Sequence, residues 1–215
     1  MGITIDLNRR IYRFLIVMHS IKPTIWRSIE LDEDATFWDL HIAIQDAMSW
    51  DNAHLHEFVI SDPHMKHDLV IGIPVEDEFM DPEEQPDPAW MCELSSVFIN
   101  IGEKATYRYD FGDGWECDVI LEGMFLSPKK VKYPQCVAGE RAAPPEDCGG
   151  VVGYYDLLDV LGDPTHEEHK DLLRWLKRTQ PRRGVYEPDV FDPSNVKFKN
   201  AQKMLEMMLE DDDFS

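Results

Sequence analysis

The sequence predicts an α+β protein with a β-grasp-like mixed sheet, a long β-hairpin, a Pro/Gly-rich loop and a C-terminal helical segment. Three observations predict this class. Apolar or alternating segments, which are typical of strands, fill much of the first half of the chain. The segment RYDFGDGWECDV, residues 108–119, contains the glycine-rich bend of a β-hairpin. After residue 150, apolar residues recur at helical spacing.

The N-terminal part is expected to consist of strand, strand, helix and strand. Residues 11–18 are apolar on both faces, which is typical of a central strand. Thr36 can cap a helix, because Asp39 stands three residues later in a capping-box position and apolar residues follow at helical spacing. This order of elements is the opening of a β-grasp-like α+β unit. Strands are predicted at residues 11–18, 25–31, 56–61 and 69–73.

The second half is expected to contain two irregular segments and then helices. Residues 76–90 are acidic and rich in proline, which predicts a loop. The sheet is expected to resume at residues 96–101. Residues 127–150 contain proline and glycine at high density, and a long ordered loop in a compact domain is often functional. Helices are predicted at residues 153–163, 166–178 and 195–209.

These elements predict one domain over residues 1–215. It divides into a sheet-rich core at 10–126, the ordered loop at 127–150, a helical part at 151–210 and an acidic tail at 211–215.

Composition excludes several classes of protein. The 215 residues include 42 acidic and 21 basic side chains, so the net charge is -21. That charge repels a phosphate backbone, and we expect no direct nucleic-acid binding but rather a basic protein as partner.

No apolar run is long enough to span a bilayer and no signal peptide is recognisable, which predicts a soluble, cytoplasmic protein. The four cysteines form no CxxC pair and are expected to be free thiols.

The register of the predicted hairpin depends on the length of its loop. With a two-residue turn at 113–114, apolar residues would face charged residues across the strands. With the three-residue loop Gly112-Asp113-Gly114, the aromatic residues share one face, and we prefer this register. The pairs it predicts are Phe111–Trp115, Tyr109–Cys117, Tyr107–Val119, Arg108–Asp118 and Asp110–Glu116.

The preferred register places three acidic residues together. Asp110 would lie opposite Glu116, with Asp113 at the nearby tip, and like charges directly opposed are destabilising. A cation beside this trio would relieve the repulsion. Arg141 is one candidate and a divalent metal ion is another, while a solvated pair or a structural ion pair is the alternative.

Further candidate ligands lie outside the hairpin. Cys136 and Cys148 stand at the two ends of the Pro-rich loop, but their spacing is looser than that of paired zinc knuckles. Glu146 and Asp147 lie in the same loop, where acidic side chains also bind backbone amides of rigid turns. At most one of His54 and His56 is expected to join any single site. The alternative for either is a hydrogen-bonded core histidine.

Five segments, taken in order, resemble the plasmid pRiA4b ORF-three-like family. The resemblance runs from Tyr12 to Val196 and implies an α+β fold with no established biochemical activity. Members are also described as passenger proteins of transposable elements. The family pattern reads YDFGDxWxH, and this chain has Cys117 at the position of the histidine. The segments are IKPTIWRSIEL, TFWDLHIAIQDAMSWDNAHLHEF, YRYDFGDGWECDVILE, YPQCVAGERAAPPEDCGGVVGYYDLL and YEPDVFDPSNV.

Two functions follow from these observations. The first is an acidic binding or adaptor protein for a basic partner, which agrees with the charge and with the lack of a nucleophile elbow, Walker loop or dinucleotide fingerprint. The alternative is a metal-dependent, hydrolase-like enzyme in which the hairpin and loop residues converge with a histidine, so that a divalent metal activates water. A third interpretation is a structural domain with no chemistry. The most informative structural observation is whether residues 136–150 fold over the hairpin face.

Overall fold

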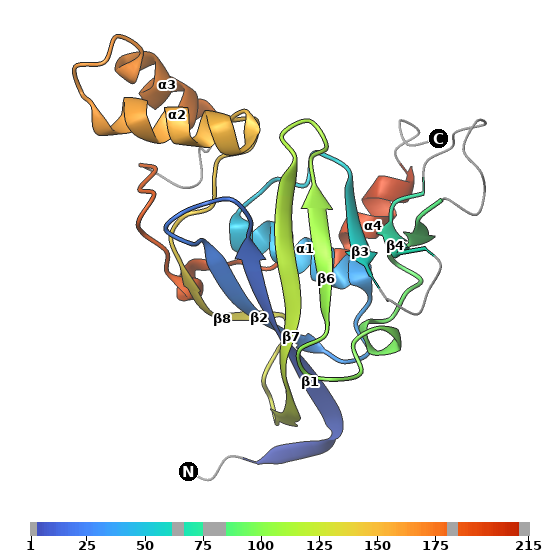
Figure 1. Ribbon diagram of the computed structural model, residues 1–215. Helices are drawn as coiled ribbons and strands as arrows, with labels where there is room; N and C mark the ends of the chain where they lie inside the picture. Colours follow the sequence, from blue (N-terminus) through green and yellow to red (C-terminus); the bar gives the residue numbers. More distant parts are fainter. Residues whose placement is uncertain (1–3, 62–66, 75–84, 180–184, 211–215) are drawn as a thin grey trace.

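The computed structural model describes residues 4–61, 67–74, 85–179 and 185–210 and shows a mixed α+β fold (Figure 1). Its eight strands form one sheet in the order β5-β4-β3-β6-β7-β1-β2-β8. Neighbouring strands are antiparallel except for the β4–β5 pair. The α+β class is therefore confirmed, while the β-grasp-like arrangement stays a prediction. The strands are β1 (Ile5–Met18), β2 (Trp26–Asp32), β3 (His56–Ile60), β4 (Leu69–Gly72), β5 (Asp87–Pro88), β6 (Lys104–Tyr109), β7 (Trp115–Pro128) and β8 (Gln135–Glu140).

Helix α1 (Phe37–Met48) lies across one face of the sheet and builds the core (Figure 1). The predicted capping box is present: the Asp39 N–H donates to Thr36 Oγ1 at 3.2 Å, and the Thr36 N–H donates to Asp39 Oδ2 at 2.8 Å. Apart from Asp39, every residue of α1 is buried. The apolar side chains of α1 pack on the inward-facing residues of β1, β3, β6 and β7.

The first two C-terminal helices have ends within three residues of the prediction, whereas the last begins at Ala201 instead of residue 195. Helices α2 (Gly150–Gly162) and α3 (His169–Thr179) form a pair beyond one end of the sheet, and α4 (Ala201–Glu210) lies beside α1 (Figure 1). The Trp38 indole N–H joins α1 to α4 by donating to the Ala201 carbonyl at 2.9 Å. Within the described ranges, no helix combines the length and the apolar character needed to cross a membrane.

Two local predictions differ from the structure. The strand expected at residues 96–101 is wrong, because Leu94–Ser96 form a 3-10 helix and turns follow. Residues 135–140, expected within a loop, form β8 and pair with β2. The acidic tail and most of the predicted acidic loop lie outside the described residues.

The hairpin between β6 and β7 has a longer loop than predicted. Tyr109 pairs with Trp115 and Tyr107 pairs with Cys117, so the loop contains five residues, 110–114, instead of three. Arg108 accordingly pairs with Glu116, and Asp110 does not lie opposite Glu116. The predicted inward face is otherwise confirmed, because both registers keep Tyr107, Tyr109, Trp115 and Cys117 on the same side, and all four are buried.

Asp110 is the physical reason for the longer loop. Its backbone adopts a left-handed conformation (φ 54), which ends β6 at Tyr109. Its Oδ1 accepts hydrogen bonds from the N–H groups of Gly112 (3.0 Å) and Asp113 (3.2 Å), an arrangement typical of aspartate in turns. Its carbonyl accepts from the Gly114 N–H at 2.6 Å. As a result Phe111 leaves the sheet, and 58% of it is exposed instead of buried as predicted.

Candidate functional site

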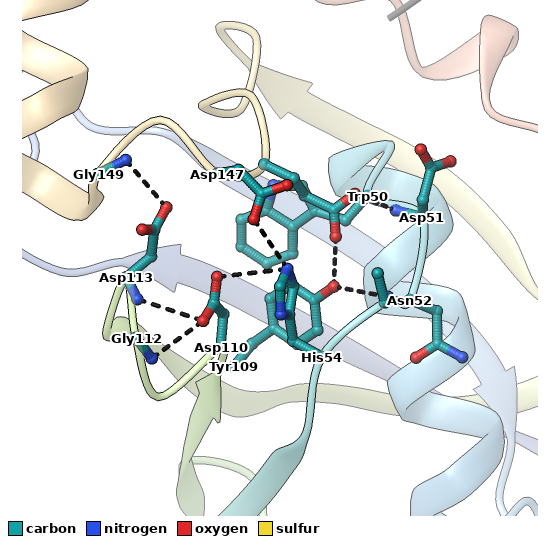
Figure 2. Close-up of polar contacts among 12 residues, drawn as sticks. Trp50, Asp51, Asn52, His54, Tyr109, Asp110, Gly112, Asp113, Asp147 and Gly149 are labelled. Atoms are coloured by element: carbon teal, nitrogen blue, oxygen red, sulfur yellow. Dashed lines mark hydrogen bonds and ion pairs between the residues drawn. The ribbon is translucent and has the colours of Figure 1, made fainter. Parts of the chain in front are cut away.

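The loop before α2 folds over the tip of the β6–β7 hairpin (Figure 2). The Gly149 N–H donates to Asp113 Oδ2 at 3.2 Å. Gly150 packs so closely that a Cβ there would lie 2.3 Å from the Asp113 carbonyl oxygen, and its φ is 66. On the other side, the Trp50 indole N–H donates to the Pro144 carbonyl at 3.0 Å. Three segments far apart in the sequence, namely residues 50–55, the hairpin tip and residues 144–150, therefore meet here.

Glu146 joins two of these segments. Its Oε2 accepts the Asp51 N–H at 2.7 Å, and its Oε1 accepts a hydrogen bond from the Tyr109 hydroxyl. That hydroxyl in turn accepts the Ala53 N–H at 3.2 Å. Burial raises the pKa of Glu146 above its ordinary value, and burial also raises the pKa of Tyr109. Because both carboxylate oxygens are occupied, Glu146 fixes the loop to the core.

The side chains of His54, Asp110 and Asp147 converge beside the hydrogen bonds of Glu146 (Figure 2). His54 Nε2 lies 3.1 Å from Asp147 Oδ1 and 3.5 Å from Asp110 Oδ2. One ligand atom from each residue lies within 4.8 Å of the other two. The exposed fractions of the side chains are 9% for Asp110, 30% for His54 and 69% for Asp147. The group is thus buried at one side and open to solvent at the other.

The hairpin turn orients Asp110 within this group. Since Oδ1 is held by the N–H groups of Gly112 and Asp113, Oδ2 is the atom directed at His54. Asp147 has a left-handed backbone as well (φ 56), a conformation that short polar side chains tolerate. The two carboxylates therefore approach the same ring nitrogen, His54 Nε2, one from the hairpin and one from the loop.

The charge balance of this group differs from that of a similar group on β7. There, His19 contacts Glu116 (3.5 Å) and Asp118 (3.0 Å), and each of these carboxylates has a Lys or Arg partner. Those partners are Arg108 for Glu116 and Lys104 for Asp118. In the described part of the chain, the ion pairs of Asp110 and Asp147 are with His54 alone. Two carboxylates thus share one imidazole, which is the imbalance a bound cation would relieve.

The structure separates the predicted acidic trio. Asp110 points to His54 and Asp113 points to Gly149. Glu116 belongs to the His19 group, because the strand register places it beside Arg108. Arg141 is not the cation of the trio either, since its guanidinium forms an ion pair with Asp189.

The remaining candidate ligands also lie outside the group of three. Cys136 is in β8, with its Sγ 3.5 Å from the Ala138 carbonyl, and Cys148 Sγ lies 4.0 Å from the Gly150 carbonyl. All four cysteines are free thiols, as predicted. Burial raises the pKa of the Cys148 thiol to about 12, and its Sγ is not among the three atoms that converge.

His56 is a core residue stacked on His41. The two rings are 3.4 Å apart and nearly parallel. His41 contacts the Tyr107 hydroxyl (2.8 Å) and Asn52 Oδ1 (2.6 Å), whereas neither ring nitrogen of His56 has a hydrogen-bond partner among the described residues. Burial lowers the pKa of His41 to about 3 and lowers that of His56 well below its ordinary value. Only His54 of the two predicted histidines therefore reaches the site, and sequence reasoning missed the partner His41.

A larger cavity of 760 Å³ lies beside the C-terminal end of α1. Arg27, Trp50, Tyr186 and Phe191 are among the described residues that line it, and none of the candidate site residues is among them. A smaller hollow of 310 Å³ is lined by Ala53, His54, Leu55, Asp110 and Phe111. Of the two, only the smaller hollow adjoins the candidate ligands.

Comparison with known proteins identifies the family of this chain and a solved structure with a similar fold. Residues 10–195 match the family model described as Plasmid pRiA4b ORF-3-like protein. The chain belongs to this family. The uncharacterized protein y4hQ of Sinorhizobium fredii (strain NBRC 101917 / NGR234) is 32% identical over 166 residues, which are 77% of this chain and 80% of that protein. The crystal structure of MM3350 from Methanosarcina mazei Go1, a protein of unknown function, has a TM-score of 0.74 and 38% identity, covering 88% of this chain and 99% of that one. Family membership thus supports the fold and assigns no activity.

The three convergent residues fit a divalent metal ion. Imidazole nitrogen and carboxylate oxygen are ligands of Zn²⁺ and Mn²⁺, and a site with three protein ligands keeps a position open for water or substrate. The backbone hydrogen bonds to Asp110 Oδ1 are outer contacts of the kind that orient ligating carboxylates.

Proposed function

We propose that this protein binds a divalent metal ion through His54, Asp110 and Asp147 and acts as a metal-dependent hydrolase. The observation that carries the proposal is the convergence of one imidazole and two carboxylates within 4.8 Å. The absence of a Lys or Arg partner for these carboxylates among the described residues supports it.

The residues of this chain would have distinct roles. Asp110, held by the turn, supplies a fixed carboxylate oxygen, and Asp147, more exposed, can adjust as the coordination changes. His54 supplies a neutral imidazole nitrogen. When bound, the metal would supply a water of lowered pKa as the nucleophile. The hollow lined by Ala53, Leu55 and Phe111 gives a substrate access to that side of the site.

Metal titration tests the proposal directly. Protein purified without a metal-affinity tag and stripped with a chelator is titrated with Zn²⁺, Mn²⁺ and Mg²⁺ in a calorimeter. We expect one site for at least one of these ions, and at least a tenfold loss of affinity in His54→Ala and Asp110→Asn. An ion at about 100 times its Kd stabilises the folded state by about 2.7 kcal/mol, which a thermal melt also detects.

His19→Ala is the matched control. His19 also contacts two carboxylates, but these already have Lys104 and Arg108 as partners, so its loss is expected to leave the metal affinity unchanged. Equal affinities for the wild type and His54→Ala would overturn the proposed site. That result would indicate that the three side chains form a structural hydrogen-bonded cluster without an ion.

The net charge of -21 supports a second candidate, an acidic binding or adaptor protein for a basic protein partner. We propose it together with a cytoplasmic location, an association with mobile elements and no direct nucleic-acid binding. Affinity for basic proteins encoded beside its gene, measured at low and high salt, is the test. Binding that is strong at low salt and lost at high salt is expected. The idea loses its support if these proteins do not bind at low salt.

A further inference from the structure

The hollow beside the metal ligands combines two kinds of wall. The lining residues His54 and Asp110 have polar side chains, and Ala53, Leu55 and Phe111 have apolar ones. Because two of the proposed ligands are also wall residues, a molecule in the hollow touches the metal position and the apolar wall together. Its volume of 310 Å³ is at the lower end of the range for ligand pockets, which suits a group the size of a phenyl ring or a short acyl chain.

Phe111 is presented to this hollow by the turn itself. The left-handed backbone at Asp110 takes Phe111 out of the β6–β7 ladder and leaves 58% of it exposed. The loop that carries it is fixed on both sides. The N–H groups of Gly112 and Asp113 bind Asp110, and the Asp113 carboxylate binds the Gly149 N–H. An apolar ring that is already held in place offers contact area to a ligand with little loss of conformational entropy on binding.

The charges limit what the polar end of the ligand can be. Metal ligation requires carboxylate and neutral imidazole forms of the ligands, so a divalent ion bound by two carboxylates and one imidazole would leave the site with no net charge. A head group with neutral or singly charged oxygen donors fits such a site, since oxygen donors complete the coordination of Zn²⁺ or Mn²⁺.

We propose that this site selects ligands with an oxygen-donor head that binds the metal and an adjacent apolar group of about phenyl size that packs against Phe111 and Leu55. The inference rests on the proposed metal site and names the class of molecule that the site takes. Phe111 is a specificity residue in this scheme and is not a metal ligand.

Two hydroxamic acids that differ only in the apolar group provide the probes. Acetohydroxamate and benzohydroxamate carry the same metal-binding head, and their affinities for the metal-loaded protein are measured by calorimetry. We expect benzohydroxamate to bind about tenfold more tightly than acetohydroxamate, because it buries more apolar surface. In Phe111→Ser the ratio of the two affinities is expected to approach one, with the affinity for the metal itself unchanged.

Val152→Ser is the matched control, because Val152 is an exposed apolar residue on α2 and is not among the residues that line the hollow. It should keep the wild-type ratio. A ratio near one in the wild type, or a preference that survives in Phe111→Ser, would overturn this inference while leaving the metal site intact. If the protein binds no metal in the first titration, the proposed function and this inference both fail. If it binds metal but shows no preference between the two hydroxamates, only this inference fails.

Discussion

The stacked pair His41 and His56 predicts a specific sensitivity to acid. Both rings are buried and neutral in the folded state, because burial lowers the pKa of His41 to about 3 and that of His56 well below the ordinary value of 6.5. In the unfolded chain both rings take up a proton below that ordinary value. The unfolded state then binds more protons than the folded state, so the free energy of unfolding falls as the pH falls.

The magnitude follows from the size of the shifts. Each such histidine lowers the free energy of unfolding by about 1.4 kcal/mol per pH unit, from the unfolded pKa down to the folded one. For His41 this window runs from 6.5 to about 3. Between pH of about 6.5 and about 4.5, His41 alone costs about 2 kcal/mol of the 5–15 kcal/mol typical of a folded domain, and His56 acts in the same direction.

Urea unfolding followed by tryptophan fluorescence at several pH values measures the effect. The many carboxylates of the chain also titrate in this range, so the informative quantity is the difference between the wild type and His56→Leu. We expect the free energy of unfolding of His56→Leu to fall less steeply, by about 1.4 kcal/mol per pH unit, because one proton-uptake site is absent from the unfolded chain. His166→Leu, which alters an exposed histidine, should keep the wild-type slope. Parallel slopes for the wild type and His56→Leu would refute the reasoning.

Two further predictions concern the loop over the hairpin. Gly150→Ala would place a Cβ 2.3 Å from a backbone oxygen at a positive φ, so we expect a loss of at least about 1 kcal/mol in thermal or urea unfolding. Gly162→Ala, which meets no atom within 4 Å, should cost nothing, and equal effects would contradict the close packing. Glu146→Gln replaces one carboxylate oxygen with an NH2 group, which cannot accept a hydrogen bond from the Tyr109 hydroxyl or the Asp51 N–H. We expect the free energy of unfolding to fall by about 1–3 kcal/mol and amide hydrogen exchange at Asp51 to become faster. Glu187→Gln, at an exposed position, is its control. Unchanged amide exchange at Asp51 in Glu146→Gln would argue against the proposed role of Glu146 in fixing the loop to the core.

Local signals allowed much of the fold to be predicted. The capping box of Thr36 and Asp39 is a contact within one turn, so the sequence alone places the start of α1. The alternation of Tyr107 and Tyr109 is a two-residue repeat, which identifies the inward face whatever the register. By contrast, β8 forms in a segment rich in proline and glycine because β2 offers a free edge, and that pairing is non-local.

The site was predicted only in part. Asp110, Asp147 and His54 were all named as candidates, but their convergence depends on the loop docking onto the hairpin, which no local pattern encodes. The length of the hairpin loop depended on the left-handed backbone at Asp110, which apolar alternation does not report. For the same reason Glu116 was placed in the wrong group.

The position of the three ligands along the chain has a topological consequence. His54, Asp110 and Asp147 belong to three segments widely separated in sequence, and α2 begins only three residues after Asp147. An ion held by all three would join the hairpin, the loop before α2 and the segment after α1 in the folded state only, because the unfolded chain lacks the assembled site. Chelation would remove one contact at the base of α2 while the hydrogen bonds of Glu146 and Gly149 remain, so we expect a local loosening around Asp147 and not the release of the helical pair.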